Sequence, residues 1–149
     1  MITVFLSKYC REFTRLRRFF NHYNIEFEVV PLQATDQCLT LSDYKTLVRG
    51  LAKSEGVEDF ELLVSQKKRK QLAPKLRKMN PEERVAFFNE NITALRGAIT
   101  YDSKRDITLL GFNEDELRTL LPREVKKQAS AEILEYARQL EREVPYEAY

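Results

Sequence analysis

Cys10 is the side chain of this sequence best placed for chemistry, because it stands between an apolar run and the start of an amphipathic segment. The N–H groups and the dipole of a helix N-terminus favour an anion. Lys8 and Arg11 add positive charge on either side, and Arg15 lies one turn further on. Such surroundings favour the thiolate, which is the reactive form of a cysteine. The sequence therefore predicts that Cys10 is a nucleophile or an oxidant sensor. A small packing residue is the alternative.

Cys38, the second of the two cysteines, follows the second predicted strand, at the same end of a parallel sheet as Cys10. A Cys10–Cys38 disulfide and an unpaired Cys38 both stay open, because the separation of the two residues decides between them. Phe13 stands three residues after Cys10, where a local two-cysteine switch needs its partner. His22 has no metal-ligand spacing, so we expect neither a metal nor a cofactor.

Strands and helices alternate in the segments that must position Cys10. A β-branched and aromatic run at 2–6 and an alternating run at 25–30, ended by Pro31, predict two strands. Between them, apolar residues recur at helical spacing from Cys10 to about Asn24, which predicts an amphipathic helix. The chain thus opens as a βαβ unit.

Capping patterns and glycines divide the middle of the chain into helices. Thr40 or Ser42 caps a helix that we expect to end at about Gly50, and a further helical piece follows Gly56. An Asn-Pro-Glu-Glu capping pattern at 80–83 marks another helix start.

The last third of the sequence returns to strands. Runs at 98–101 and 106–110, joined by turn-forming residues, predict a β-hairpin. A second capping pattern at 113–116 begins one helix, and a final helix covers about 125–142. This order predicts an α/β, thioredoxin-like fold, in which helices flank a four-stranded mixed sheet and a helical insertion covers about 40–95.

Length and composition limit the class of protein. The 149 residues suit one domain, which we place at 1–142, followed by a flexible acidic tail at 143–149. A net charge of +2 is too small to make the whole chain a nucleic-acid binder. Two cysteines do not make a disulfide scaffold. No basic leader or membrane-length apolar run occurs, so we expect a cytoplasmic protein without membrane contact.

The densest positive charge is the run formed by Lys67, Lys68, Arg69 and Lys70, which contains no acidic residue. Lysines and arginines on one helix face contact phosphates without reading sequence. A contact with promoter DNA and a solvated helix face are both open interpretations. The run is too small for strong DNA binding by itself.

Two segments resemble the Spx family of transcription regulators. The first is the strand-Cys10-helix opening, and the second is Gly-Phe-Asn-Glu-Asp-Glu-Leu-Arg at 111–118, followed by Leu-Pro-Arg-Glu-Val at 121–125. The resemblance extends from Met1 to about Lys127. It implies a thioredoxin-like fold related to arsenate reductases. It also implies a monomeric regulator that binds the C-terminal domain of the RNA polymerase α subunit and changes promoter use under stress.

The resemblance assigns roles to particular residues. Gly56 falls at the family's contact with polymerase α, where a missing Cβ allows close approach; a simple glycine between helices is the alternative. Arg96 keeps the first residue of an Arg-Arg-Pro segment beside the active cysteine, where it would stabilise an anion, and the rest of that segment is not kept. Cys10 matches the first cysteine of a Cys-x-x-Cys switch, and Phe13 replaces the second. The family's internal disulfide is therefore lost.

The alternative function is an arsenate-reductase-like or glutaredoxin-coupled thiol oxidoreductase. Arsenate reductases hold their oxyanion with several arginines. This sequence offers a single cysteine at the helix start and an incomplete arginine set. We therefore expect a regulator and not an enzyme.

Overall fold

Four strands form one mixed sheet in the computed structural model, which describes residues 1–32 and 37–121. The strands are β1 (Ile2–Leu6), β2 (Phe27–Pro31), β3 (Ala98–Asp102) and β4 (Ile107–Leu110). Their order is β2-β1-β3-β4, with β1 parallel to β2 and the other two pairings antiparallel. The predicted four-stranded mixed sheet is confirmed. The predicted helix at 125–142 and tail at 143–149 lie outside the described residues.

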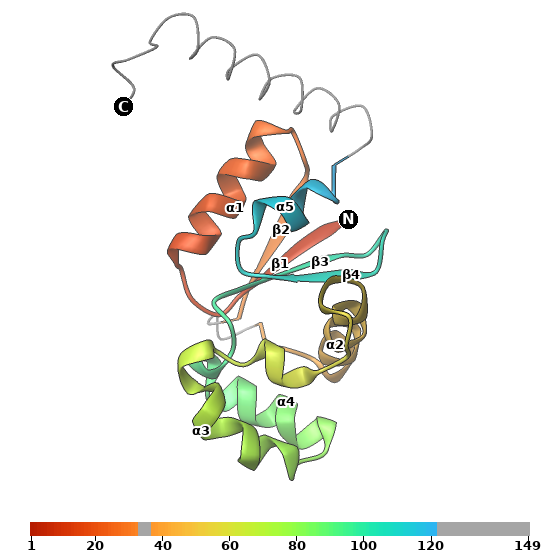
Figure 1. The fold of residues 1–149 in the computed structure, drawn as a ribbon. Coiled ribbons are helices and arrows are strands. Elements are labelled where there is room, and N and C mark those ends of the chain that lie inside the picture. The colour runs from red at the N-terminus through yellow and green to blue at the C-terminus, as the bar shows by residue number, and fades with distance from the viewer. Residues whose placement is uncertain (33–36, 122–149) are drawn as a thin grey trace, which may run out of the picture.

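Helices cover both faces of this sheet (Figure 1). One face carries α1 (Arg11–His22) and α5 (Glu114–Arg118), and the other carries α2 (Leu41–Glu55). Beyond α2 lie α3 (Gln66–Arg77) and α4 (Pro81–Glu90), with short 3-10 turns η1 (Phe60–Leu63) and η2 (Ile92–Ala94). All the helical elements from α2 to η2 lie between β2 and β3 in sequence, which confirms the predicted insertion.

Side chains of alternating direction on β1 divide the interior into two cores. Ile2, Val4 and Leu6 pack against α1 and α5, whereas Phe5 packs against α2 and the insertion. Successive strand residues point to opposite faces, so a strand buried on both faces is apolar throughout. This explains why the 2–6 run shows no polar alternation.

The capping patterns mark the helix starts correctly. Thr40, rather than Ser42, caps α2, and its side chain and that of Asp43 form a reciprocal capping box. Asn80 and Glu83 do the same for α4, with Pro81 as the first helical residue. These devices satisfy N–H groups that have no partner inside the helix.

Two predicted boundaries are wrong. The α2 helix continues through Gly50 and ends at Glu55, because Gly50 is the point of closest approach to β4 and not a helix stop. The second strand begins at Phe27, not at residue 25, and includes Pro31, which pairs with Leu6. Proline fits there because β2 is at the edge of the sheet and needs no outward N–H.

Polar contacts hold the C-terminal half of α2 on the β3–β4 hairpin. Thr108 donates its buried hydroxyl to the Leu47 carbonyl at 2.8 Å, and Ser54 donates to the Thr108 carbonyl at 2.5 Å. Arg49 makes two 2.9 Å hydrogen bonds to the Asp106 carboxylate. The end of α2 therefore has a fixed position relative to the sheet.

Helices long and apolar enough to span a bilayer are absent from the described residues.

Candidate functional site

Cys10 is the N-cap residue of α1, as the sequence predicts. Its backbone is extended, and its side chain makes no capping hydrogen bond. The thiol is partly buried, and the loop before it is held in place by Ser7. Ser7 is fully buried and donates its hydroxyl to the Arg96 carbonyl at 2.8 Å, while its N–H bonds to Gly97 O at 3.0 Å. The cysteine is thus positioned against the segment that enters β3.

Gly97 leaves the space that Cys10 occupies. A Cβ at position 97 would lie 3.0 Å from the Cys10 sulfur and 3.4 Å from Lys8 Cε. Cβ contacts shorter than about 3.4 Å are rare, so a side chain here would push the thiol aside. The glycine is therefore a feature of the site and not only a departure from the expected segment.

Four basic side chains line the pocket of about 260 Å³ that contains Cys10. They are Lys8, Arg11, Lys67 and Arg96. Arg96 is the most enclosed of the predicted anion-stabilising residues, with 15% of its side chain exposed. Its guanidinium lies 3.9 Å from Glu12, the one carboxylate among the residues that line this pocket. The pocket as a whole favours anions.

Lys67 also lines this pocket, although its position in the sequence suggests only a DNA contact or a solvated helix face. It lies in the first turn of α3, whose N-cap Ser65 makes no side-chain capping bond. The Ser65 N–H bonds to Ala94 O at 2.7 Å, and Val64 pairs with Leu95. These backbone contacts bring the α3 N-terminus beside Arg96 and Cys10. A bridge between single residues leaves no sequence pattern, so nothing in the sequence predicts this approach.

Arg15 and Cys38 lie apart from the Cys10 pocket. Arg15 lines a different hollow, between α1 and the start of α5. Cys38 is exposed, in the segment before α2, and both cysteines are free thiols. The structure therefore contains no Cys10–Cys38 disulfide.

Beside the Cys10 pocket lies a second polar hollow, of about 300 Å³, which shares Arg96 and Gln66 with it. Glu55 and Glu116 supply two carboxylates there. Burial, together with the negative charge of Glu55, raises the pKa of Glu116. Arg69 and Arg96 line it as well, so the cationic pocket adjoins a hollow of mixed charge.

The surface at the end of α2 contains Gly56 and Val57. Gly56 is the C-cap in the left-handed conformation, at φ +80°, and this alone explains a glycine at the position. A Cβ there would meet no atom within 4 Å, so its outer side is open. Val57 is 55% exposed, so its apolar side chain is available for contact. The two residues form a small uncovered surface.

The basic run of α3 divides between structural and exposed residues. Arg69 turns inward and donates to the carbonyls of Leu62 and Val64 at 3.4 and 3.2 Å. Lys67, Lys68 and Lys70 are exposed. Arg69 is therefore a poor candidate for DNA contact, and three lysines remain.

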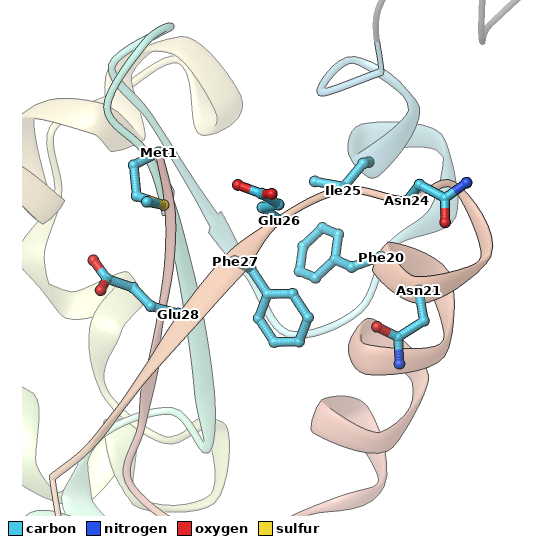
Figure 2. Close-up of a pocket in the computed structure, with 8 residues that line it drawn as sticks. All are labelled: Met1, Phe20, Asn21, Asn24, Ile25, Glu26, Phe27 and Glu28. Atoms are coloured by element: carbon cyan, nitrogen blue, oxygen red, sulfur yellow. The ribbon is translucent and has the colours of Figure 1, made fainter.

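A further hollow, of about 610 Å³, lies at the opposite end of the sheet, where β1 begins and β2 follows α1. Figure 2 shows its walls, formed by Met1, Phe20, Phe27 and the turn around Asn24. Glu26 and Glu28 are the charged side chains among the described residues that line it, and none of these residues has a thiol or a basic side chain. Its lining therefore offers carboxylates but no thiol, and it is not a second site for thiol chemistry.

Comparison with known proteins places the chain in a family. No family model matches it. A curated relative from Streptococcus agalactiae, the global transcriptional regulator Spx, is 30% identical over 133 residues, which are 86% of this chain and 88% of that protein. The chain belongs to the Spx family. The regulator of the same name from Streptococcus mutans is 28% identical over 132 residues, with the same coverage of each chain.

Solved structures agree on the fold. A Staphylococcus aureus protein solved by NMR, SACOL0876, superposes with a TM-score of 0.61 at 22% identity, over 80% of this chain and 97% of the other. A putative ArsC family related protein from Bacteroides fragilis gives 0.58 at 17% identity with the same coverage. The predicted thioredoxin-like fold of the ArsC and Spx type is confirmed.

Within the Spx family, this chain has a fully apolar residue where a second cysteine would face Cys10. Phe13 is 5% exposed and packs in the α1–α5 core. The Tyr9 ring meets it edge-on at 5.9 Å, and the Arg17 guanidinium lies 5.7 Å from its centroid. The side chain at position 13 is therefore part of the hydrophobic core. A disulfide at Cys10 therefore has to use a thiol from another position or another molecule.

Proposed function

We propose that this protein is an Spx-like transcription regulator that binds the C-terminal domain of the RNA polymerase α subunit through the end of α2. The family supports a regulatory role, because the curated relatives are named global transcriptional regulators. The observation that carries the proposed surface is the open backbone of Gly56 beside the exposed side chain of Val57.

The shape of this surface suits close docking of a folded partner. A partner backbone can approach Gly56 without meeting a side chain, and Val57 supplies apolar area. Because the contacts from Thr108, Ser54 and Arg49 hold α2 on the hairpin, the surface is preorganised. Preorganised surfaces lose less conformational entropy on binding.

Binding of the isolated α C-terminal domain to the full chain, measured by titration calorimetry, tests the proposal. Val57→Asp should weaken binding at least tenfold, because it places a charge in an apolar contact. Gly56→Asn should weaken it as well, since asparagine tolerates the left-handed cap but adds a side chain. Gly56→Arg is less informative because the bulky residue would also strain the cap.

Gln71→Glu is the matched control, because it adds a negative charge at an exposed position of α3, outside the end of α2. It should leave affinity unchanged. No measurable binding by the unaltered chain would contradict the proposal. Equal affinity for Val57→Asp and the unaltered chain would move the contact to another surface.

A contact with promoter DNA through Lys67, Lys68 and Lys70 extends the proposal. The three exposed lysines could neutralise phosphates once polymerase brings the protein to a promoter. Lys68→Ala together with Lys70→Ala should reduce the slope of log affinity against log salt, for the ternary complex, by about 2. An unchanged slope would identify the lysines as a solvated helix face.

Cys10 would act as a single-cysteine sensor, modified by a low-molecular-weight thiol or by Cys38. Its support is the cationic pocket, which attracts anionic thiol compounds. Mass spectrometry after mild oxidation with glutathione should find the mixed disulfide at Cys10, and none in Cys10→Ser. Modification confined to Cys38 would contradict this role.

The same pocket favours one second function, thiol-dependent reduction of an oxyanion such as arsenate. Four basic side chains around a cysteine can hold such an anion. In that reaction arsenate and two thiols would give arsenite, a disulfide and water. Arsenate-dependent consumption of glutathione that requires Cys10 would establish the enzyme. Its absence, with α-domain binding intact, would leave the regulator.

A further inference from the structure

A hollow of about 620 Å³ lies between α1 and the start of α5, separate from the Cys10 pocket. Its floor is aromatic, formed by Phe19, Tyr23 and Phe112. The rings of Phe19 and Tyr23 are 4.9 Å apart, and Tyr23 and Phe112 are only partly buried. The hollow can therefore receive a further ring, since aromatic pairs prefer centroid separations of about 4.5–7 Å.

The rim of this hollow is basic. Arg15 and Arg18 are exposed, one turn apart on α1, and His22 follows one turn later. In the part of the chain that the structure describes, no carboxylate lies within 4.0 Å of either arginine. Glu114, the carboxylate on the rim, lies 3.2 Å from Arg118. Among the described residues, the two arginines thus have no ionic partner beside the aromatic floor.

We propose that residues 141–149 of this chain dock into this hollow, with a tyrosine ring on the aromatic floor and glutamates beside Arg15 and Arg18. That segment reads Glu-Arg-Glu-Val-Pro-Tyr-Glu-Ala-Tyr. It carries three carboxylates against one arginine, and two tyrosines. Its charge and its aromatic content are both complementary to the hollow.

Because residues 141–149 belong to the same chain as the hollow, they stay near it and bind without a second molecule. The described part of the chain ends at Leu121, which packs in the same core as Phe19 of α1. Residues 122–140 can span about 30 Å with the predicted helix formed, and about 60 Å when extended. A tethered segment reaches an effective concentration in the millimolar range, so a weak contact is enough for occupancy.

A nucleic-acid backbone fits the hollow less well. Glu114 lines the hollow at the start of α5, where Asp115 and Glu116 follow it in the first turn, and this negative charge would repel a run of phosphates. A peptide with a few carboxylates can place them toward α1 and avoid α5.

NMR of the full chain tests the docking through the resonances of Tyr146 and Tyr149. Arg18→Glu should shift the signals of both tyrosines toward those of a free peptide of residues 141–149. Arg17→Glu is the matched control. It makes the same charge change at an exposed position of α1, but Arg17 lies over Phe13 and does not line the hollow. It should leave the tyrosine signals in place.

A charge swap gives the reciprocal evidence. Glu147→Arg should also release the segment, and Arg18→Glu combined with Glu147→Arg should restore at least part of the docked signals. The proposal is overturned if Arg18→Glu and Arg17→Glu give identical tyrosine spectra. It is also overturned if the shifts grow with protein concentration, because the segment would then bind a second copy.

Discussion

Gly50 of α2 and Thr108 of β4 are in such close contact that no side chain fits between them. A Cβ on residue 50 would stand 2.2 Å from the Thr108 hydroxyl oxygen and 2.8 Å from its backbone nitrogen. Thr108 uses that hydroxyl to bond the Leu47 carbonyl in the same helix. The glycine therefore sets how closely α2 lies on the sheet, and with it the position of the proposed partner surface.

Gly50→Ala should destabilise the protein by about 2 kcal/mol, as overpacking of a tight core contact does. This is opposite in sign to the usual gain of Gly→Ala inside a helix, about 1 kcal/mol. Urea unfolding measures the difference, and Ala52→Gly at an exposed position of α2 reports intrinsic propensity alone. A stabilised Gly50→Ala would show that α2 can move away from β4 at little cost.

Asp106 should make stability depend on pH between about 4 and 2. Hydrogen bonds from Arg49 and Tyr101 lower the pKa of this carboxyl from 3.8 to about 2. A lowered folded pKa adds stability above the unfolded pKa, and that stability is lost as pH falls through the folded one. Asp106→Asn should therefore be less stable than the unaltered chain at pH 6, and the difference should shrink toward zero as the pH falls through about 2.

Urea midpoints at several pH values test this relationship. Asparagine is suitable because residue 106 has φ +53°, which it tolerates. Carboxyl titration followed by NMR gives the pKa directly. A constant stability difference down to pH 2 would mean that the carboxylate charge contributes nothing.

The cationic pocket should make Cys10 selective for anionic reagents. Relative to iodoacetamide, iodoacetate should react better with Cys10 than with the exposed Cys38, and added salt should reduce this preference. Lys67→Glu should reduce it severalfold. Lys70→Glu makes the same charge change on α3 outside the pocket lining and should have a much smaller effect. Equal effects of the two variants would indicate that the overall positive charge of α3, and not the local pocket, sets the preference of Cys10 for iodoacetate.

Gly97→Ala should slow alkylation of Cys10 more than it changes stability. The new Cβ would lie 3.0 Å from the Cys10 sulfur, so the sulfur has to move away by a few tenths of an ångström. A Cys38→Ser background leaves Cys10 as the single thiol to measure. An unchanged alkylation rate would show that the thiol already points away from residue 97.

Local patterns were enough to predict the framework of the fold and the position of Cys10. Caps such as Asn80 and the apolar run of β1 act over a few residues, so the sequence displays them directly. The error at Gly50 has a different origin, because its partner Thr108 is 58 residues away and a close approach resembles a helix stop. The sequence likewise gives no sign that Lys67 lies near Cys10. The two residues line one pocket because the Val64–Leu95 bridge brings the start of α3 beside the segment that enters β3.

The segments that line the Cys10 pocket are synthesised at different times. Its walls come from residues 8–12, 65–67 and 96–97, so they come from three separate parts of the chain. During synthesis from the N-terminus, the thiol leaves the ribosome about 85 residues before Arg96 and Gly97. A newly made chain therefore presents Cys10 without its cationic walls, and reagents that meet it then act on an ordinary thiol.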